Sequence, residues 1–187
     1  MDPKSKIVQN AALLALKYHA GQYRLYGLPF VIHPVMVATI LAQNGFNEET
    51  IAAGFLHDVL EDTNCSEKEI RKECGDKVLK IVKTVSKNPR IKEKEQWEQQ
   101  KDLYIEAVRR GSIGAKAVCL ADKIHNAQSL LEEYKKHGPS IFSKFVRGKD
   151  IKVASEKKVL AMLKESWNHP LLTVYEELIK QEDKLTG

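Results

Sequence analysis

Residues 51–60 read Ile-Ala-Ala-Gly-Phe-Leu-His-Asp-Val-Leu, and this stretch decides the fold. Asn47 precedes it as a candidate N-cap, and two glutamates follow that residue, where carboxylates favour the positive end of the helix dipole. Because the stretch is apolar on nearly every side, it predicts a helix at the centre of a helical core. His57 and Asp58 interrupt the apolar run, so they require an explanation of their own.

Further helices are predicted on both sides of this stretch, and no segment alternates as a strand does. Ser66-Glu67-Lys68-Glu69 matches a capping box, and Gly21 ends the first predicted helix. The predicted helices cover about 6–20, 33–44, 47–60, 66–75, 76–85, 96–110, 113–133, 152–167 and 170–182. We therefore predict an all-α fold, with residues 1–187 forming a single-domain helical bundle.

The composition is that of an ordinary soluble globule, with 43% hydrophobic and 29% charged residues. The chain has 30 Lys+Arg against 25 Asp+Glu, a net charge of +5 that suits an anionic partner, either a nucleotide or a nucleic acid, without deciding between them. The sequence shows no nucleic-acid-binding motif, so no nucleic-acid partner is expected. There is no apolar run of about 18 residues and no secretory signal, so we expect a cytoplasmic protein without a membrane partner. Cys65, Cys74 and Cys119 form no CxxC pair and are predicted to be structural thiols.

Four titratable residues lie close together at the end of the central helix. Glu61 and Asp62 follow His57 and Asp58 by four residues, and therefore lie one turn further along the same faces. Imidazole and carboxylate groups together suit a divalent metal such as manganese, iron or zinc. Two simpler explanations stay open. His57 would be a buried hydrogen-bonded histidine with Asp58 turned to solvent, and the two later acids would belong to a solvated helix end.

Asp122 and His33 are further candidates elsewhere in the chain. Asp122 interrupts an apolar helix, where aspartate has poor intrinsic propensity, and Asn126 follows it by one turn. His33 precedes Pro34 at a predicted helix start. The alternatives are an ion pair between Asp122 and Lys123, and a capping role for His33.

Three separated segments occur in an order that resembles the HD hydrolase domain of RelA/SpoT homologues. The segments are Gly21-Gln-Tyr-Arg24 with Gly27-Leu-Pro-Phe-Val-Ile-His33-Pro34, Gly54-Phe-Leu-His57-Asp58-Val-Leu-Glu61-Asp62-Thr63, and Leu120-Ala-Asp122-Lys-Ile-His-Asn126. The resemblance covers about residues 5–135, and the helices of 139–187 are expected to complete the bundle. The chain length resembles that of the stand-alone small alarmone hydrolases, including those of the metazoan SpoT-homologue type.

This resemblance implies an all-helical HD-domain fold and hydrolysis of ppGpp or pppGpp to pyrophosphate and GDP or GTP. It implies a manganese ion, with other divalent metals as alternatives. The implied metal ligands are His33, His57, Asp58 and Asp122. Glu61 and Asp62 are implied to position or activate the attacking water, and Arg24 and Asn126 to contact a small-molecule nucleotide substrate.

The chain departs from the family pattern directly after Arg24. The family usually carries a basic residue at the next position, where this chain has Leu25, followed by Tyr26. This departure motivates an alternative substrate, either a nucleoside monophosphate or an NADPH-like dinucleotide. A non-catalytic nucleotide-binding module is a third hypothesis, motivated by the basic charge balance.

Two further expectations concern the surface. Exposed apolar helix faces could support a homodimer. A group of basic residues could form a rim that attracts a polyanion, although a solvated loop explains the same residues. The group consists of Lys83, Lys87, Arg90, Lys92 and Lys94.

Overall fold

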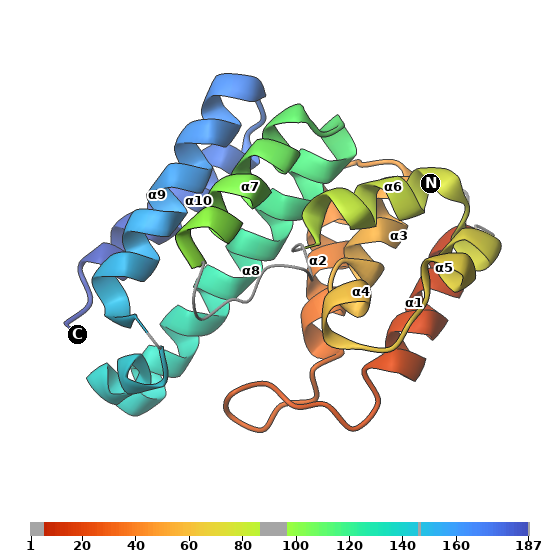
Figure 1. The fold of residues 1–187 in the computed structure, drawn as a ribbon. Coiled ribbons are helices and arrows are strands. Elements are labelled where there is room, and N and C mark those ends of the chain that lie inside the picture. Colours follow the sequence, from red (N-terminus) through yellow and green to blue (C-terminus); the bar gives the residue numbers. More distant parts are fainter. Residues whose placement is uncertain (1–5, 87–96, 146, 187) are drawn as a thin grey trace. The chain divides into compact units, whose positions relative to one another are not determined.

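The computed structural model describes residues 6–86, 97–145 and 147–186, and within them almost every element is a helix (Figure 1). Tyr23 and Pro29 form an isolated β-bridge. The helices are α1 (Lys6–Tyr18), α2 (Ile32–Gln43), α3 (Glu48–Leu56), α4 (Val59–Asp62), α5 (Glu67–Cys74), α6 (Asp76–Val85), α7 (Trp97–Arg110), α8 (Ile113–His137), the 3₁₀ helix η1 (Gly138–Lys144), α9 (Gly148–Ser166) and α10 (Leu171–Asp183). The predicted all-α fold is confirmed.

The chain divides into two compact units, residues 1–121 and residues 122–187. The boundary falls inside α8, whose first part belongs to the first unit and whose second part belongs to the second. Each unit has its own apolar residues and is described separately below.

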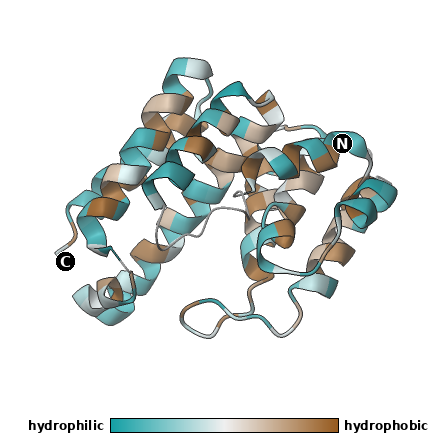
Figure 2. Cartoon of the chain, viewed as in Figure 1, coloured by the Kyte–Doolittle hydropathy of each residue, from teal (hydrophilic) through white to brown (hydrophobic). Residues whose placement is uncertain are grey.

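Helix α3 is the centre of the first unit, as its sequence predicts. It packs against α1, α2 and α6, and Ile51, Ala52 and Leu56 are almost completely buried. The side chain of Asn47 caps α3 by accepting a hydrogen bond from the Thr50 amide at 3.0 Å. In α1 and α6, hydrophobic and hydrophilic residues lie on different sides of the helix, and the apolar sides face this core (Figure 2).

Gly54 allows α3 to approach α2 closely. A Cβ atom built on Gly54 would lie 2.6 Å from Cδ1 of Leu41 and 3.3 Å from the Cα of Ala38. The Leu41 side chain is fully buried and the Ala38 atom belongs to the backbone, so neither neighbour can move freely. Glycine at position 54 therefore sets the spacing between α2, which carries His33, and α3, which His57 follows directly.

The second unit contains the end of α8 together with η1, α9 and α10. Helices α9 and α10 pack on each other, and Tyr175, Met162 and Leu163 are almost completely buried. Lys152 Nζ lies 2.6 Å from Oε2 of the buried Glu182, and burial raises the pKa of that carboxyl. Helix α9 begins four residues before its predicted start, and the 3₁₀ helix η1 lies between the helices predicted at 113–133 and 152–167.

No helix in the part of the chain that the structure describes combines the length and the apolar character needed to cross a bilayer.

Candidate metal and active site

The central run of residues 51–60 is broken at the His57-Asp58 pair. Helix α3 ends at Leu56, and the short helix α4 begins at Val59. The prediction of one continuous helix to residue 60 is therefore wrong at this point. His57 Nδ1 donates a hydrogen bond to the Gly54 carbonyl oxygen at 2.9 Å, and this side-chain bond competes for the carbonyl that an α-helix would offer to the residue four places later.

The break brings three predicted ligands together inside the first unit. His57 Nε2 lies 3.0 Å from His33 Nε2 and 3.1 Å from Asp58 Oδ2, and His33 Nε2 lies 3.5 Å from the same carboxylate oxygen. His33 and His57 are buried, whereas the Asp58 side chain is 22% exposed. The carboxylate therefore faces the two imidazoles, and the alternative of an Asp58 turned to solvent is wrong.

The donor atoms fit one divalent ion. Two ligand atoms that each bind one ion at about 2.1 Å lie about 3.0–3.4 Å apart at tetrahedral or octahedral angles. The three observed separations of 3.0, 3.1 and 3.5 Å agree closely with that range. Because the Gly54 carbonyl can only accept, His57 carries its proton on Nδ1 and directs the lone pair of Nε2 toward the cluster. Metal binding by the cluster of His33, His57 and Asp58 is thus chemically consistent.

His33 does not cap its helix. Val31 is the N-cap residue of α2, and His33 is the second residue inside the helix, directly before Pro34. The imidazole packs edge-on against Phe30, with ring centroids 6.0 Å apart, and against His57, with centroids 4.9 Å apart. These ring contacts hold the side chain of His33 toward the cluster.

Glu61 and Asp62 are the last two residues of α4, separated from His57 and Asp58 by two residues. The backbone amides of both residues donate to the carbonyl oxygen of Asp58, at 3.1 and 2.9 Å. These two hydrogen bonds fix the backbone of both acids relative to Asp58, independently of the conformation of their side chains. Glu61 is half-buried and Asp62 is exposed. Their role in handling water stays a prediction.

Arg24 lies in a closed turn between α1 and α2. Its amide donates to the Leu28 carbonyl at 2.8 Å, its carbonyl accepts from the Gly27 amide at 2.9 Å, and Gly27 has a φ of +86°. Glycine adopts this left-handed conformation without strain. Arg24 and Tyr26 are half-buried, and Leu25 is 56% exposed. The loop predicted over residues 21–30 is therefore a hairpin-like turn with a defined backbone.

Asp122 and Asn126 lie on α8 at the start of the second unit. Asp122 Oδ1 accepts a hydrogen bond from Asn126 Nδ2 at 2.5 Å, and Asp122 Oδ2 lies 3.1 Å from Lys123 Nζ. The ion pair that the sequence offered as an alternative therefore exists. Whether Asp122 is also a fourth metal ligand stays a prediction.

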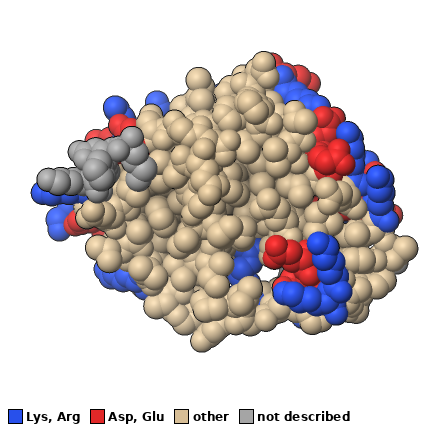
Figure 3. Space-filling view, turned by 180° about the vertical axis from the view of Figure 1, so that it is seen from behind, with Lys and Arg blue, Asp and Glu red and all other residues tan. Residues whose placement is uncertain are grey.

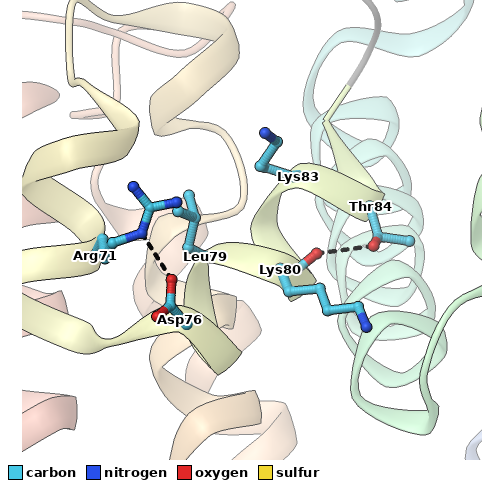
Figure 4. Close-up of a pocket in the computed structure, with 6 residues that line it drawn as sticks. All are labelled: Arg71, Asp76, Leu79, Lys80, Lys83 and Thr84. Carbon is cyan, nitrogen blue, oxygen red and sulfur yellow. Dashed lines mark hydrogen bonds and ion pairs between the residues drawn. The ribbon is translucent and has the colours of Figure 1, made fainter.

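A separate hollow of about 440 Å³ lies on α5 and α6 (Figure 4). It is lined by Arg71, Asp76, Leu79, Lys80, Lys83 and Thr84, and by none of the predicted site residues. Arg71 Nε pairs with Asp76 at 2.7 Å, and Lys83 pairs with Glu67 at 2.8 Å. Much of its positive charge is therefore neutralised by acids of this chain.

Of the predicted basic rim, Lys83 is the member that the structure describes. The others, Lys87, Arg90, Lys92 and Lys94, lie outside the described residues. On the face shown in Figure 3, basic and acidic side chains lie beside each other, and much of the surface carries neither charge. This face differs from the single-sign stripe that is typical of nucleic-acid-binding proteins.

A family model described as "HD domain" matches residues 11–151. The chain belongs to the HD-domain family. The matched range includes the adjacent His57 and Asp58, which lie at the break between α3 and α4.

Curated relatives of this HD domain include enzymes of alarmone metabolism. The chain is 38% identical over 121 residues to a guanosine-3′,5′-bis(diphosphate) 3′-pyrophosphohydrolase of Haemophilus influenzae, a match that covers 63% of this chain and 18% of the relative. It is 35% identical over 127 residues to the bifunctional (p)ppGpp synthase/hydrolase SpoT of Escherichia coli, covering 67% of this chain and 18% of the relative. The HD domain thus matches less than a fifth of the length of these relatives.

A solved structure resembles this chain over almost its whole length. It is described as a metazoan ortholog of SpoT that hydrolyzes ppGpp and plays a role in starvation responses. The two chains are 26% identical, the TM-score is 0.80, and the match covers 99% of each chain. The resemblance to RelA/SpoT-type HD domains predicted from the sequence is confirmed.

Proposed function

We propose that this chain is a metal-dependent phosphohydrolase that removes the 3′-diphosphate of ppGpp or pppGpp. The products are pyrophosphate and GDP or GTP. The observation that carries the proposal is the convergence of His33, His57 and Asp58, whose donor atoms lie 3.0–3.5 Å apart, in a chain whose relatives are named for this reaction. The solved structure that matches it over 99% of both chains is described as hydrolyzing the same nucleotide.

The proposed ion is Mn²⁺, held by His33, His57, Asp58 and Asp122. A divalent ion at such a site lowers the pKa of a bound water and polarises a phosphoryl oxygen. The protein's part is to hold the ligands in the correct protonation state. The bond from His57 Nδ1 to the Gly54 carbonyl does this for one of them, since it leaves Nε2 unprotonated.

The proposed acid–base groups are Glu61 and Asp62. A carboxylate next to the attacking water can accept its proton while the water oxygen bonds to phosphorus and the bond from phosphorus to the ribose 3′ oxygen breaks. That 3′ oxygen leaves as a hydroxyl after it takes up a proton. Both carboxylates follow the ligand Asp58 by one helical turn, which supports this assignment.

The proposed substrate contacts are Arg24 and Asn126. The planar guanidinium of Arg24 can stack on a base or pair with phosphate, and the defined turn around it would limit its movement. The curated relatives reported above are named as enzymes of guanosine polyphosphates. They therefore do not favour the alternative substrates suggested by Leu25. They also do not favour a non-catalytic nucleotide-binding module.

We extend the proposal to the whole chain: residues 1–187 act as one HD phosphohydrolase domain in the cytoplasm, with residues 139–187 completing the bundle. A homodimer is part of the proposal because exposed apolar side chains, among them Leu13 and Leu16 of α1, lie on the first unit. Analytical ultracentrifugation of the full chain tests this part separately from catalysis.

The direct test is product analysis after incubation of the purified full chain with ppGpp and Mn²⁺. The proposal expects GDP and pyrophosphate in equal amounts, and a chelator should abolish both. Release of inorganic phosphate, or no turnover by folded and Mn²⁺-loaded protein, would overturn it.

A further inference from the structure

Gln22 joins three segments around the candidate site through its side chain and its backbone. Its side-chain Oε1 lies 2.7 Å from His19 Nδ1, and its Nε2 donates to the Asp62 carbonyl oxygen at 2.9 Å. Its backbone carbonyl accepts a hydrogen bond from the Phe30 amide at 2.9 Å. One residue therefore contacts the end of α1, the turn that carries Arg24, and the last residue of α4.

The direction of these side-chain bonds follows from simple chemistry. The Asp62 carbonyl can only accept, so the amide nitrogen of Gln22 must face it. The amide oxygen then faces His19, whose Nδ1 must be the donor. His19 is 2% exposed, and its ring stacks on Phe30 with centroids 4.6 Å apart. Buried and stacked in this way, His19 is a rigid support for the Gln22 side chain.

We propose that Gln22 is a positioning residue for the acid pair, because it holds the end of α4 against the turn that carries Arg24. The inference rests on the proposed function, since it assigns Gln22 to the water-handling role proposed for Glu61 and Asp62. Gln22 contacts none of the three clustered metal ligands by a hydrogen bond. Its side chain therefore acts on the placement of the acids and not on metal binding.

The variant Gln22→Ala removes both side-chain bonds and leaves the backbone bond to Phe30. We expect kcat for ppGpp with Mn²⁺ to fall by about tenfold or more, because a small misplacement of a catalytic group is costly, while KM and Mn²⁺ affinity change less than about twofold. Gln22→Glu is the second variant. An ionised carboxylate still accepts from His19 but cannot donate to the Asp62 carbonyl, so kcat should fall here too.

Asn10 offers a matched control. Its Nδ2 donates to the Glu73 carbonyl at 2.8 Å, which is the same kind of bond between an amide side chain and a distant backbone oxygen, but it joins α1 to α5. Asn10→Ala should lower thermal stability by an amount similar to Gln22→Ala and leave kcat unchanged. If both variants lower kcat in proportion to their loss of stability, Gln22 is merely structural and the inference is wrong.

Hydrogen exchange gives a readout that does not depend on catalysis. Peptides covering residues 58–64 should exchange about tenfold faster in Gln22→Ala and Gln22→Glu than in wild type, because the end of α4 loses a tertiary partner. Asn10→Ala should leave the exchange rate of these peptides unchanged. Wild-type protein that does not hydrolyse ppGpp would refute the proposed function, yet the exchange would still decide whether Gln22 holds α4. Unchanged exchange in both Gln22 variants would overturn the inference.

Discussion

Nδ1 of His57 donates to the carbonyl oxygen of Gly54, one turn earlier, at 2.9 Å. This bond determines which nitrogen of His57 carries the proton, and it directs Nε2 toward His33 and Asp58. It also coincides with the end of α3, so the same interaction that prepares the ligand accompanies the break in the helix. Position 54 thus affects both helix packing and the candidate metal site.

The variant Gly54→Ala should lower the free energy of unfolding by about 1–3 kcal/mol, the usual cost of overpacking. The added methyl would lie 2.6 Å from Leu41 Cδ1, so α2 and α3 must separate. Mn²⁺ affinity should fall with it, because α2 carries His33 and His57 directly follows α3. Urea unfolding and calorimetric titration measure the two effects.

Leu41→Ala supplies the control for this clash. The double variant should be less destabilised than the sum of the single variants, because Leu41→Ala removes the atom that the new methyl meets. Simple additivity would show that the collision with Leu41 is not the cause.

Asp58→Ala should abolish stoichiometric Mn²⁺ binding, since its carboxylate oxygen lies within 3.5 Å of Nε2 of both imidazoles. Asp122→Ala should weaken binding strongly if the fourth ligand is correctly assigned. Equilibrium dialysis with elemental analysis measures both. Asp76→Ala is the control, because Asp76 is an exposed aspartate paired with Arg71, and it should retain the metal. Unchanged metal content in Asp58→Ala would show that the site is wrongly placed.

Glu61→Gln should retain Mn²⁺ and lower kcat by about 100-fold or more, the usual contribution of a positioned general base. The amide keeps the size of the side chain but cannot accept a proton from water. Asp62→Asn provides the comparison that tells which acid takes the proton. Full activity in both variants would remove these acids from the mechanism.

Arg24→Ala should raise KM for ppGpp by about tenfold or more with a smaller change in kcat, because a charge-assisted contact to the substrate is worth about 1.5–3 kcal/mol. Arg24→Lys keeps the positive charge of the side chain but removes the planar guanidinium group. If the guanidinium stacks on the base, lysine should not restore KM. Leu25→Ala, at an exposed neighbouring position, should leave KM unchanged.

Cys65 and Cys74 should resist alkylation in the native protein. Burial raises the pKa of each thiol to about 11, so at pH 8 only about one molecule in a thousand carries the reactive thiolate at each site. Because the ordinary thiol pKa is 9.0, the folded state holds these protons more tightly, and stability should fall as the pH rises from 9 to 11. Titration with a disulfide reagent, native against denatured, measures accessibility. Rapid native reaction at both thiols would contradict their burial.

Local signals were sufficient to predict most of the helices, whereas the residues of the candidate site were assigned from the resemblance to RelA/SpoT-type HD domains. The cap at Asn47 and the capping serine at Ser66 are short-range interactions, and both are present, with Ser66 Oγ accepting from the Glu69 amide at 3.2 Å. The break at His57 could not be predicted from periodicity, because the run on both sides is apolar. It depends on a side chain competing for a backbone carbonyl inside a packed core.

The role of Gln22 was missed for a related reason. It lies in a segment rich in glycine, where composition predicts only a loop, and its partner Asp62 is 40 residues away. Nothing in the neighbouring sequence indicates that pairing. Asp122 illustrates the opposite case, because its ion pair with the adjacent Lys123 was foreseeable, whereas membership of a metal site depends on residues far along the chain.

The short helix α4 makes the length of the chain between Gly54 and Asp62 as important as its composition. One residue inserted or deleted between Asp58 and Glu61 would turn Glu61 and Asp62 by about 100° relative to Asp58. A change of length between Gly54 and His57 would instead displace His57 from the Gly54 carbonyl oxygen. The turn from Arg24 to Leu28 is closed by its own backbone bonds, so a change of length at its tip would be absorbed locally. Relatives and engineered variants should therefore differ in length at the turn and keep a fixed count of residues from Gly54 to Asp62.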